Sequence, residues 1–491
     1  VQAAANDAPE RVLRYLRDAL GREVGRLDAE GFLVETRYDR AGRIEATIAY
    51  AAATPDAARA TGDLAALRPL AHADDQLTRY FHDARGNRIG VLDAEGALTE
   101  AVFDEARNER AVRVYHQRIA SPAGNESFAQ LRAQVQAGGA RETRRQFDAL
   151  GQLRTELDPE GTLSRYSYDA QGRLLKTERA VGTSEVREGH RRYDVFGNLI
   201  GELDGEGATR LLPGMSEAQL DAIYAQYGVR HGYDVLGRRT ESIDAEGNKT
   251  WYFYDVAGRP TFTVHGVQDA AGVRNGAGEV SETRYTNFGQ VGETIAYTGR
   301  ILIAAPHDRA RVDDAVRALQ FVAAQDSRHR FVYDRRGQLT EHTDAEGAVI
   351  RNRYNGFGEL AAQWRDLGAG REAETRYAYD RRGQRLSQTE QSVGAATDGS
   401  LRSVSRGFDA FGRVATATDA RGHSIQYGYD RLGRQISQRQ SVSGREEMAS
   451  TAYDVHGRVL TQTDALGRVT RYAYDEATRS ATVTTPEGIS T

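Results

Sequence analysis

The chain has 491 residues, with 65 basic and 70 acidic side chains mixed along it for a net charge of -5, so no basic block offers itself to nucleic acid or to an anionic membrane. Apolar residues make up 39% of the chain and the mean hydropathy is -0.62. This is too few apolar residues for a thick core, so the composition favours a thin, extended or hollow body. Cysteine is absent, which excludes a disulfide framework and a cysteine-bound metal.

A Tyr-Asp-x-x-Gly tetrad returns along the whole chain. The commonest step is 21 residues, as from Tyr233 to Tyr254, and a longer period of 65 residues separates Tyr38, Phe103 and Tyr168. Counting substitutes for the aromatic residue gives roughly seventeen copies. Because each unit of a repeat array needs only its neighbours, we predict one continuous domain over residues 1–491. The residues predicted to form this structural repeat motif are Tyr38, Asp39, Gly42, Tyr168, Asp169, Gly172, Tyr193, Asp194, Gly197, Tyr233, Asp234, Gly237, Tyr254, Asp255, Gly258, Tyr333, Asp334, Gly337, Tyr379, Asp380, Gly383, Tyr429, Asp430, Gly433, Tyr453, Asp454 and Gly457.

A second tetrad, Asp-x-x-Gly, alternates with the first. It stands at residues 28–31, 93–96, 158–161, 244–247 and 344–347. Aspartate in first place and glycine in fourth are typical of turns, so we predict φ > 0 at Gly42, Gly161, Gly172 and Gly433. The runs between the turns alternate like strands, and short turns make consecutive strands antiparallel neighbours.

The predicted fold is all-β: a long antiparallel β-hairpin array with short helical insertions. It would hold roughly thirty-four strands and extend on the order of 160 Å, so accumulated strand twist should coil it into a spiral or hollow shell. We expect the repeat aromatics to fill the seam between successive turns of that spiral. A surface that stacks sugars is the alternative role for them.

Four stretches carry apolar residues at helical spacing instead, near residues 54–70, 126–137, 212–227 and 306–324. Ser216 is typical of an N-cap before an apolar stripe. We predict helices over Ser216 to Ala225 and Arg309 to Ala323 that cover apolar strand surface. A docking surface for a partner is the alternative.

No catalytic, cofactor-binding or metal-binding residues are predicted. Phosphate loops, nucleophile elbows, zinc helices and dinucleotide fingerprints are absent from the sequence. His72, His116, His231 and His423 have no partners at metal-ligand spacing, and the Asp-x-Glu-Gly turns lack the ligand pattern of a calcium loop. The sequence has no apolar run of membrane-span length and no signal peptide at its start. It begins and ends inside a repeat, so we expect a fragment of a longer chain.

The repeat resembles that of the Rhs, or YD-repeat, proteins. Tyr233-Asp234-Val235-Leu236-Gly237-Arg238 matches their pattern, and the match recurs in register along the chain. The resemblance implies a β-sheet spiral closing into a hollow shell, as in bacterial polymorphic toxins, the C component of Tc insecticidal toxins and the teneurins. Bacterial members commonly enclose a C-terminal toxin that is released by autoproteolysis at an Asp-Pro-x-Gly region. Here those letters occur only at residues 158–161, inside the array, and we interpret them as a turn.

This resemblance implies a non-enzymatic wall segment of a secreted or delivered bacterial protein that encloses or presents a toxin. The expected partners are the remainder of its own polypeptide and an enclosed toxin domain, with no nucleic acid and no membrane span. The expected location is secreted or at the cell surface. A cell-surface adhesin that binds a glycan or protein receptor is the main alternative, and a hydrolase embedded in the repeats is a third. The longest gap, Tyr285 to Tyr333, is mostly aliphatic and charged, which favours the wall.

Overall fold

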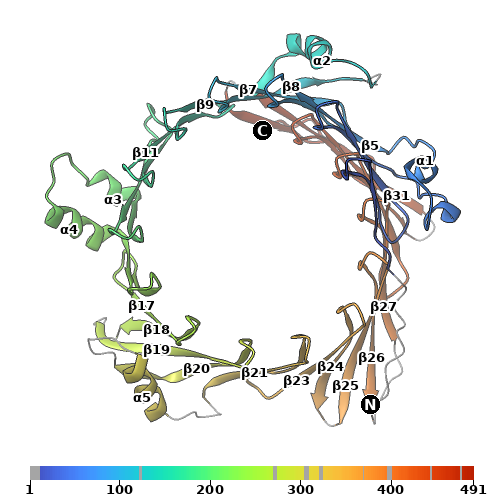
Figure 1. Cartoon of the computed structure of the whole chain (residues 1–491). Coiled ribbons are helices and arrows are strands. Elements are labelled where there is room, and N and C mark those ends of the chain that lie inside the picture. Colours follow the sequence, from blue (N-terminus) through green and yellow to red (C-terminus); the bar gives the residue numbers. More distant parts are fainter. Residues whose placement is uncertain are drawn as a thin grey trace. The chain divides into compact units, whose positions relative to one another are not determined.

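The computed structural model describes residues 11–120, 124–268, 274–302, 309–319, 325–368, 370–394, 401–442, 445–475 and 478–491. The chain forms two compact units: unit 1 is Val1–Gly161, Tyr354–Ala362 and Glu374–Thr491, and unit 2 is Thr162–Arg353 and Gln363–Ala373. The described residues hold 34 β-strands that belong to one sheet (Figure 1). The all-β prediction and the strand number expected from the repeat are confirmed.

The strands and helices of unit 1 alternate with tight turns. They are β1 Arg14–Arg17, β2 Glu23–Leu27, β3 Leu33–Tyr38, β4 Ile44–Ala49, η1 Asp56–Ala58, α1 Leu64–Leu67, β5 Gln76–His82, β6 Arg88–Leu92, β7 Ala97–Phe103, β8 Glu109–Arg118, α2 Phe128–Val135, η2 Gln136–Gly138, β9 Ala140–Phe147, β10 Leu153–Leu157, β26 Arg385–Gly394, β27 Leu401–Phe408, β28 Val414–Thr418, β29 Ser424–Tyr429, β30 Gln435–Val442, β31 Arg445–Tyr453, β32 Val459–Thr463, β33 Val469–Asp475 and β34 Ser480–Thr484.

Unit 2 has the same plan with three helices. Its elements are β11 Leu163–Tyr168, β12 Leu174–Arg179, β13 Arg187–Tyr193, β14 Leu199–Asp204, α3 Gly205–Thr209, α4 Glu217–Tyr227, β15 Val229–Tyr233, β16 Arg239–Ile243, β17 Lys249–Tyr254, β18 Pro260–Gln268, β19 Arg274–Tyr285, β20 Val291–Leu302, α5 Arg309–Leu319, β21 Ser327–Tyr333, β22 Leu339–Thr343 and β23 Val349–Tyr354. Strand β23 ends with one residue, Tyr354, in unit 1, and two further strands, β24 Leu360–Gly368 and β25 Arg371–Tyr379, also contribute residues to both units.

Neighbouring strands pair as antiparallel hairpins. In β3 and β4, Val34 lies opposite Ala49, and the register shifts between Arg37 and Tyr38, so the tetrad tyrosine stands at a β-bulge. The same shift precedes Tyr254. The predicted left-handed glycines are confirmed, with φ of 81° at Gly42, 77° at Gly161, 84° at Gly172 and 84° at Gly433. Glycine takes this conformation without a Cβ clash, which explains why it stands in most of these turns, although Arg107 holds the same place with φ of 67°.

The helices of unit 1 cover apolar strand surface, as predicted. Leu67 of α1 packs on Leu33 and Ile48, and Leu131 of α2 packs on Leu98 and Tyr115. The stretch near 54–70 is less helical than expected, because it contains only the three-residue η1 and the four-residue α1. Pro69 disfavours a helical conformation in the preceding Arg68, whose ψ is 119°, so α1 ends there.

The helices of unit 2 include one that the sequence did not suggest. Five-residue α3 contains Gly205 and Gly207, which are poor helix formers. Helix α4 is confirmed, with the Ser216 capping box at its start. In α5, Val312 and Val316 are buried against the strands as predicted, and the rest of that prediction, residues 320–323, lies outside the described residues.

Candidate functional site

The aspartate at the start of each tetrad turn stabilises that turn through hydrogen bonds to its carboxylate. In the turn after β17, one carboxylate oxygen of Asp255 accepts the backbone N–H groups of Ala257 and Arg259, both at 2.9 Å. The other oxygen accepts the side-chain Nε–H of Arg259 at 2.7 Å. These bonds, led by that from the Arg259 backbone, lower the pKa of Asp255. The arginine that follows the glycine is therefore part of the repeat motif.

That arginine also links each turn to the next along the strip. The guanidinium of Arg238 lies 4.8 Å from the ring centre of Tyr254 and donates to the carbonyl of Asp255 at 3.4 Å. Tyr254 returns a hydrogen bond from its hydroxyl to the Arg239 carbonyl, at 2.7 Å. The same hydrogen bond recurs along the strip. In each case a tyrosine hydroxyl donates to the backbone carbonyl that lies two residues after the glycine of the previous tetrad turn on the same edge. The tyrosines are Tyr38, Tyr193, Tyr233, Tyr254, Tyr285, Tyr333, Tyr379, Tyr429, Tyr453 and Tyr474.

These contacts correct one expectation from the sequence. The hydroxyls of these tyrosines bind adjacent hairpins of the same strip, so filling a seam between successive turns of a spiral is not their main role. Tyr168 and Tyr254 are half-buried, not fully buried. The physical reason is the β-bulge before each tyrosine, which turns its side chain along the sheet toward the previous repeat.

Alternate turns lie on opposite edges of a hairpin strip, so the strip has two different edges. We call the edge with the Tyr-Asp-x-x-Gly turns the YD edge and the edge with the Asp-x-Glu-Gly turns the acidic edge. Within unit 1, the acidic edge of the N-terminal segment meets the YD edge of the C-terminal segment, and Figure 1 shows the blue and orange strands side by side there.

Two equivalent hydrogen bonds define this edge contact. A carboxylate oxygen of Glu30 accepts the backbone N–H of Arg381 at 2.6 Å, and one of Glu95 accepts that of Arg431 at 2.9 Å. In both cases the third residue of an acidic turn caps the second residue of a YD turn. Four strands separate the two acidic turns, and four separate the two YD turns. At about 4.8 Å per strand both intervals are about 19 Å, so the edges are in register.

Further side chains extend the edge contact. Arg11 forms a two-pronged ion pair with Glu359, at 2.8 and 2.7 Å, and lies 4.2 Å from the ring centre of Phe357. Arg118 donates to the carbonyls of Tyr453 and Asp454, both at 3.2 Å. No local pattern in the sequence predicts these pairs, since the partners are more than 300 residues apart.

A histidine pair also lies in the edge contact. Nδ1 of His116 and Nε2 of His456 are 2.8 Å apart, and the rings meet edge to face. Burial lowers the pKa of His456, with His116, Arg458 and Arg141 adding to the effect and Asp454 opposing it. His116 was judged from the sequence to have no partner at metal-ligand spacing. Its true neighbour is distant in sequence, and among the described residues no group of three potential ligands surrounds either ring.

Buried glutamates beneath the helices were missed in the sequence. Glu35 is 1% exposed and binds the Tyr50 hydroxyl at 2.7 Å, and both side chains face α1. The guanidinium of Arg68, just after α1, donates to both Glu35 oxygens at 2.7 and 2.9 Å. Burial opposes ionisation of Glu35, but the bonds from Arg68, Arg37 and Tyr50 outweigh it and lower its pKa to about 2. Burial and the Glu35 carboxylate raise the pKa of Tyr50 to about 12.

The same pair of a buried glutamate and a tyrosine hydroxyl recurs beside other insertions. Glu100 accepts from Tyr115 at 2.7 Å and pairs with Arg132 of α2 at 3.4 Å. Glu282 accepts from Tyr297 at 2.7 Å in unit 2. The glutamate precedes the tyrosine by 15 residues each time. A sequence motif could have predicted three of the buried glutamates, because Glu-Thr-Arg-Tyr stands at residues 35–38, 282–285 and 374–377 and its glutamate is buried each time.

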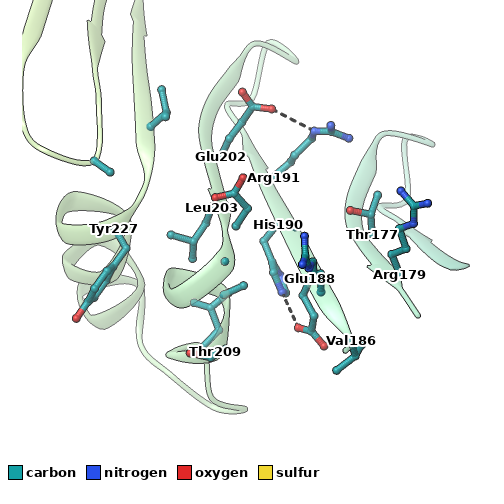
Figure 2. A pocket seen from close by; sticks show the side chains of 18 residues that line it. Thr177, Arg179, Val186, Glu188, His190, Arg191, Glu202, Leu203, Thr209 and Tyr227 are labelled. Carbon is teal, nitrogen blue, oxygen red and sulfur yellow. Dashed lines mark hydrogen bonds and ion pairs between the residues drawn. The ribbon is translucent and has the colours of Figure 1, made fainter. Parts of the chain in front are cut away.

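A cavity lies in unit 2, beside β12, β13, β14 and α3 (Figure 2). Its volume is about 1160 Å³. Its His190 pairs with Glu188 at 3.1 Å, and its Arg191 with Glu202 at 3.4 Å. The Thr209 hydroxyl donates to the Glu206 carbonyl at 2.7 Å. A nucleophile hydrogen-bonded to a base is not found among these described lining residues.

Comparison with known proteins identifies the repeat. The RHS Repeat family model matches residues 147–184, 333–371, 408–446 and 453–490, and each match begins at a tetrad aromatic. A comparison with curated proteins gives no match. In the described part of the chain no helix has the length and apolar character needed to cross a membrane.

Several solved structures are similar over nearly all of this chain. A crystal structure of TcdB2-TccC3-TEV is 14% identical with a TM-score of 0.34, over 97% of this chain and 27% of that one. For TcdB2-TccC3 the values are 13%, 0.28, 96% and 32%. For the Photorhabdus luminescens Tc holotoxin pore with a mutation in TccC3 they are 15%, 0.31, 97% and 25%. The chain thus spans about a quarter to a third of the length of these proteins.

Proposed function

Because this chain belongs to the Rhs, or YD-repeat, family, we propose that it is a wall segment of a secreted or cell-surface bacterial protein, and that the wall encloses or presents a toxin domain of the same polypeptide. The segment itself performs no catalysis. Its partners are the remaining parts of that polypeptide, and its repeat residues serve to hold the hairpins together.

The edge contact of unit 1 is the observation that carries this proposal. Glu30 and Glu95 each cap a turn of hairpins that lie more than 300 residues later in the chain. A strip whose later hairpins sit on the turn edge of its earlier ones builds a continuous surface, because side-chain hydrogen bonds join the two rows of turns. A continuous surface of this kind can separate a cargo from solvent.

A protease-protection experiment tests the proposal on the intact polypeptide. Glu30→Arg with Glu95→Arg puts positive charge against Arg381 and Arg431 and should open the edge contact, so an enclosed cargo domain should be digested faster than in the unmodified protein. Glu45→Arg, at an exposed strand position, is the control and should leave protection unchanged.

Cargo that is digested equally fast with and without the double substitution, or that is never protected, would overturn the wall proposal. In that case the adhesin alternative becomes the better one. A glycan-array or receptor-binding measurement would then be the next step.

A further inference from the structure

Beside α1, α2 and α5, a buried glutamate is held by a buried tyrosine hydroxyl and by an arginine. The tyrosine hydroxyls lie 2.7 Å from the carboxylates of Glu35, Glu100 and Glu282. The ion pairs are 2.7 Å, 3.4 Å and 2.6 Å long and come from Arg68, Arg132 and Arg284. At each of these insertions the carboxylate satisfies the hydroxyl and the guanidinium together.

The insertion that carries α4 has the tyrosine and the arginine without such a glutamate. Tyr224 of α4 is 4% exposed, and its ring packs on Gly201, where an added Cβ would lie 2.9 Å from its Cδ1. Arg192, Gly201, Arg230 and Ile243 lie opposite one another in turn on β13, β14, β15 and β16. Among the described residues, no buried carboxylate belongs to these four strands.

The guanidinium of Arg230 has no partner. Its Nε is buried without a hydrogen bond, and the described residues offer no hydrogen bond or ion pair to the rest of the group. Four other arginines have a buried Nε without a hydrogen bond, but each forms an ion pair with a carboxylate; these are Arg11, Arg132, Arg328 and Arg382. Because a partly buried cation is costly when it is not paired, Arg230 lacks an anion that the other four have.

The hydroxyl of Tyr224 is also unused. Within the described part of the chain it makes no hydrogen bond, whereas those of Tyr50, Tyr115 and Tyr297 each donate to a glutamate. Burial raises the pKa of Tyr224, although the charge of Arg192 opposes the shift. The hydroxyl therefore keeps its proton at neutral pH and can donate it to an acceptor.

A cavity of about 410 Å³ beneath α4 is lined by both of these unpartnered groups. Its two lining carboxylates already face other cations, since Asp221 pairs with Arg192 at 2.6 Å and Glu241 with Lys249 at 3.3 Å. Buried Ile243 adds an apolar part to the wall. The volume is in the range of small-ligand sites.

We propose that this α4 cavity binds a carboxylate from outside the described residues, held by the Arg230 guanidinium and the Tyr224 hydroxyl. The bound group takes the place that Glu35 has beside α1, with one charge-assisted hydrogen bond from arginine and one from the phenol. Ile243 contacts the hydrocarbon part of the ligand. This inference stands on unit 2 alone and does not rest on the wall proposal.

Calorimetric titration of the purified chain with hexanoate tests the site, and hexanamide is the neutral probe of the same size. Hexanoate should bind with a Kd on the order of 1 mM, and hexanamide about tenfold more weakly. Arg230→Gln should weaken hexanoate binding by about tenfold, and Tyr224→Phe by about threefold. Arg239→Gln, exposed on β16 and outside the cavity, is the matched control and should change nothing. Thermal unfolding without ligand should be the same for Arg230→Gln and the unmodified chain, because the substitution breaks no ion pair.

The same titration on the intact polypeptide identifies the source of the carboxylate. Binding there as well supports a site for a free small carboxylate, and loss of binding there supports a site filled by a side chain from another part of the polypeptide. Three results would overturn the proposal: no saturable binding of hexanoate to the purified chain up to about 50 mM, hexanamide binding as tightly as hexanoate, or an unchanged affinity in Arg230→Gln.

Discussion

A repeat tyrosine is held at both ends of its side chain. The ring of Tyr254 lies beside Arg238, and its hydroxyl donates to the Arg239 carbonyl. Removing a fully packed aromatic side chain costs about 3 to 5 kcal/mol, but Tyr254 is half-buried, so a smaller cost is expected. The hydroxyl contributes part of this free energy, because it donates a hydrogen bond to a carbonyl at the β-bulge of the neighbouring hairpin.

Tyr254→Phe should lower the local free energy of unfolding by about 1 kcal/mol, since it removes one hydrogen bond and keeps the ring. Tyr254→Ala should lower it further, by the ring's contacts. Native-state hydrogen exchange of the β16 and β17 amides measures both losses. Tyr252→Phe, on the same strand and also half-buried, is the control, and an equal effect there would contradict the role given to the Tyr254 hydroxyl.

The histidine pair should make the edge contact sensitive to acid. Because the pKa of His456 is lowered from 6.5, its neutral form is favoured in the folded state. That stabilisation is complete above the unfolded pKa of 6.5 and is lost as pH falls through the lower folded value. Protonation would also place a positive charge against His116, Arg141 and Arg458, which the Asp454 carboxylate offsets in part.

Hydrogen exchange in β8 and in the turn at residues 454–457 should therefore accelerate as pH is lowered from about 7 to about 5, after correction for the intrinsic rate. His456→Gln should remove this acceleration, because the amide does not titrate in that range. An unchanged pH profile in the variant would show that other groups cause the effect.

At the scale of elements, the insertions that carry α1 and α2 are fixed by a buried carboxylate as well as by apolar contacts. Helix α1 has only four residues, too few to be stable alone. Leu67 and the Arg68 ion pair to Glu35 hold it on the sheet. A carboxylate that is 1% exposed is costly unless it stays paired, so the insertion and the strand depend on each other.

Glu35→Gln should reduce the free energy of unfolding of unit 1 by about 1 to 3 kcal/mol at pH 7, because it leaves the arginine bonds weakened. The folded pKa of Glu35 is about 2 against 4.5, so its stabilisation is present above about pH 4.5 and lost as pH falls toward 2. Denaturant unfolding at pH 7 and pH 3 should show a smaller difference between the two proteins at pH 3. Glu45→Gln, on the exposed face of β4, should change neither value.

At the scale of the molecule, the edge contact of unit 1 joins segments that neighbour-to-neighbour pairing would never bring together. Glu95 has a central place in it, since it binds Arg431 through both backbone and side chain and also pairs with Arg118 at 3.3 Å. Array stability is otherwise a sum over adjacent hairpins. The edge contact adds a stabilising contribution between hairpins that are not neighbours along the strip.

Glu95→Ala should speed exchange in the YD turn at residues 430–433 and leave β28 amides nearly unchanged, because it removes the contact without touching the hairpin ladder. Glu246→Ala, the equivalent change in an acidic turn of unit 2, should not affect that turn. Equal exchange of residues 430–433 in both variants would mean that Glu95 does not hold the two edges together.

The sequence by itself determined the local structure of this protein. Tetrad spacing predicted the hairpins, the strand number, the antiparallel order and the left-handed glycines such as Gly42, because each depends on residues within one turn or one strand pair. It also located α4 from the Ser216 cap and the stripe of α5 from Val312 and Val316. It failed for α3, whose Gly205 and Gly207 oppose a helix that packing nevertheless forms.

Only the tertiary structure decided which distant groups meet. The period of the repeat is the same for every hairpin, so it cannot specify that Glu30 caps Arg381 or that His116 lies against His456, 340 residues away. The same holds for Glu35 and Arg68, whose pairing depends on how the insertion folds back over the sheet. Contacts within a hairpin follow from local geometry, whereas contacts between edges follow from the accumulated path of many strands, which no short pattern encodes.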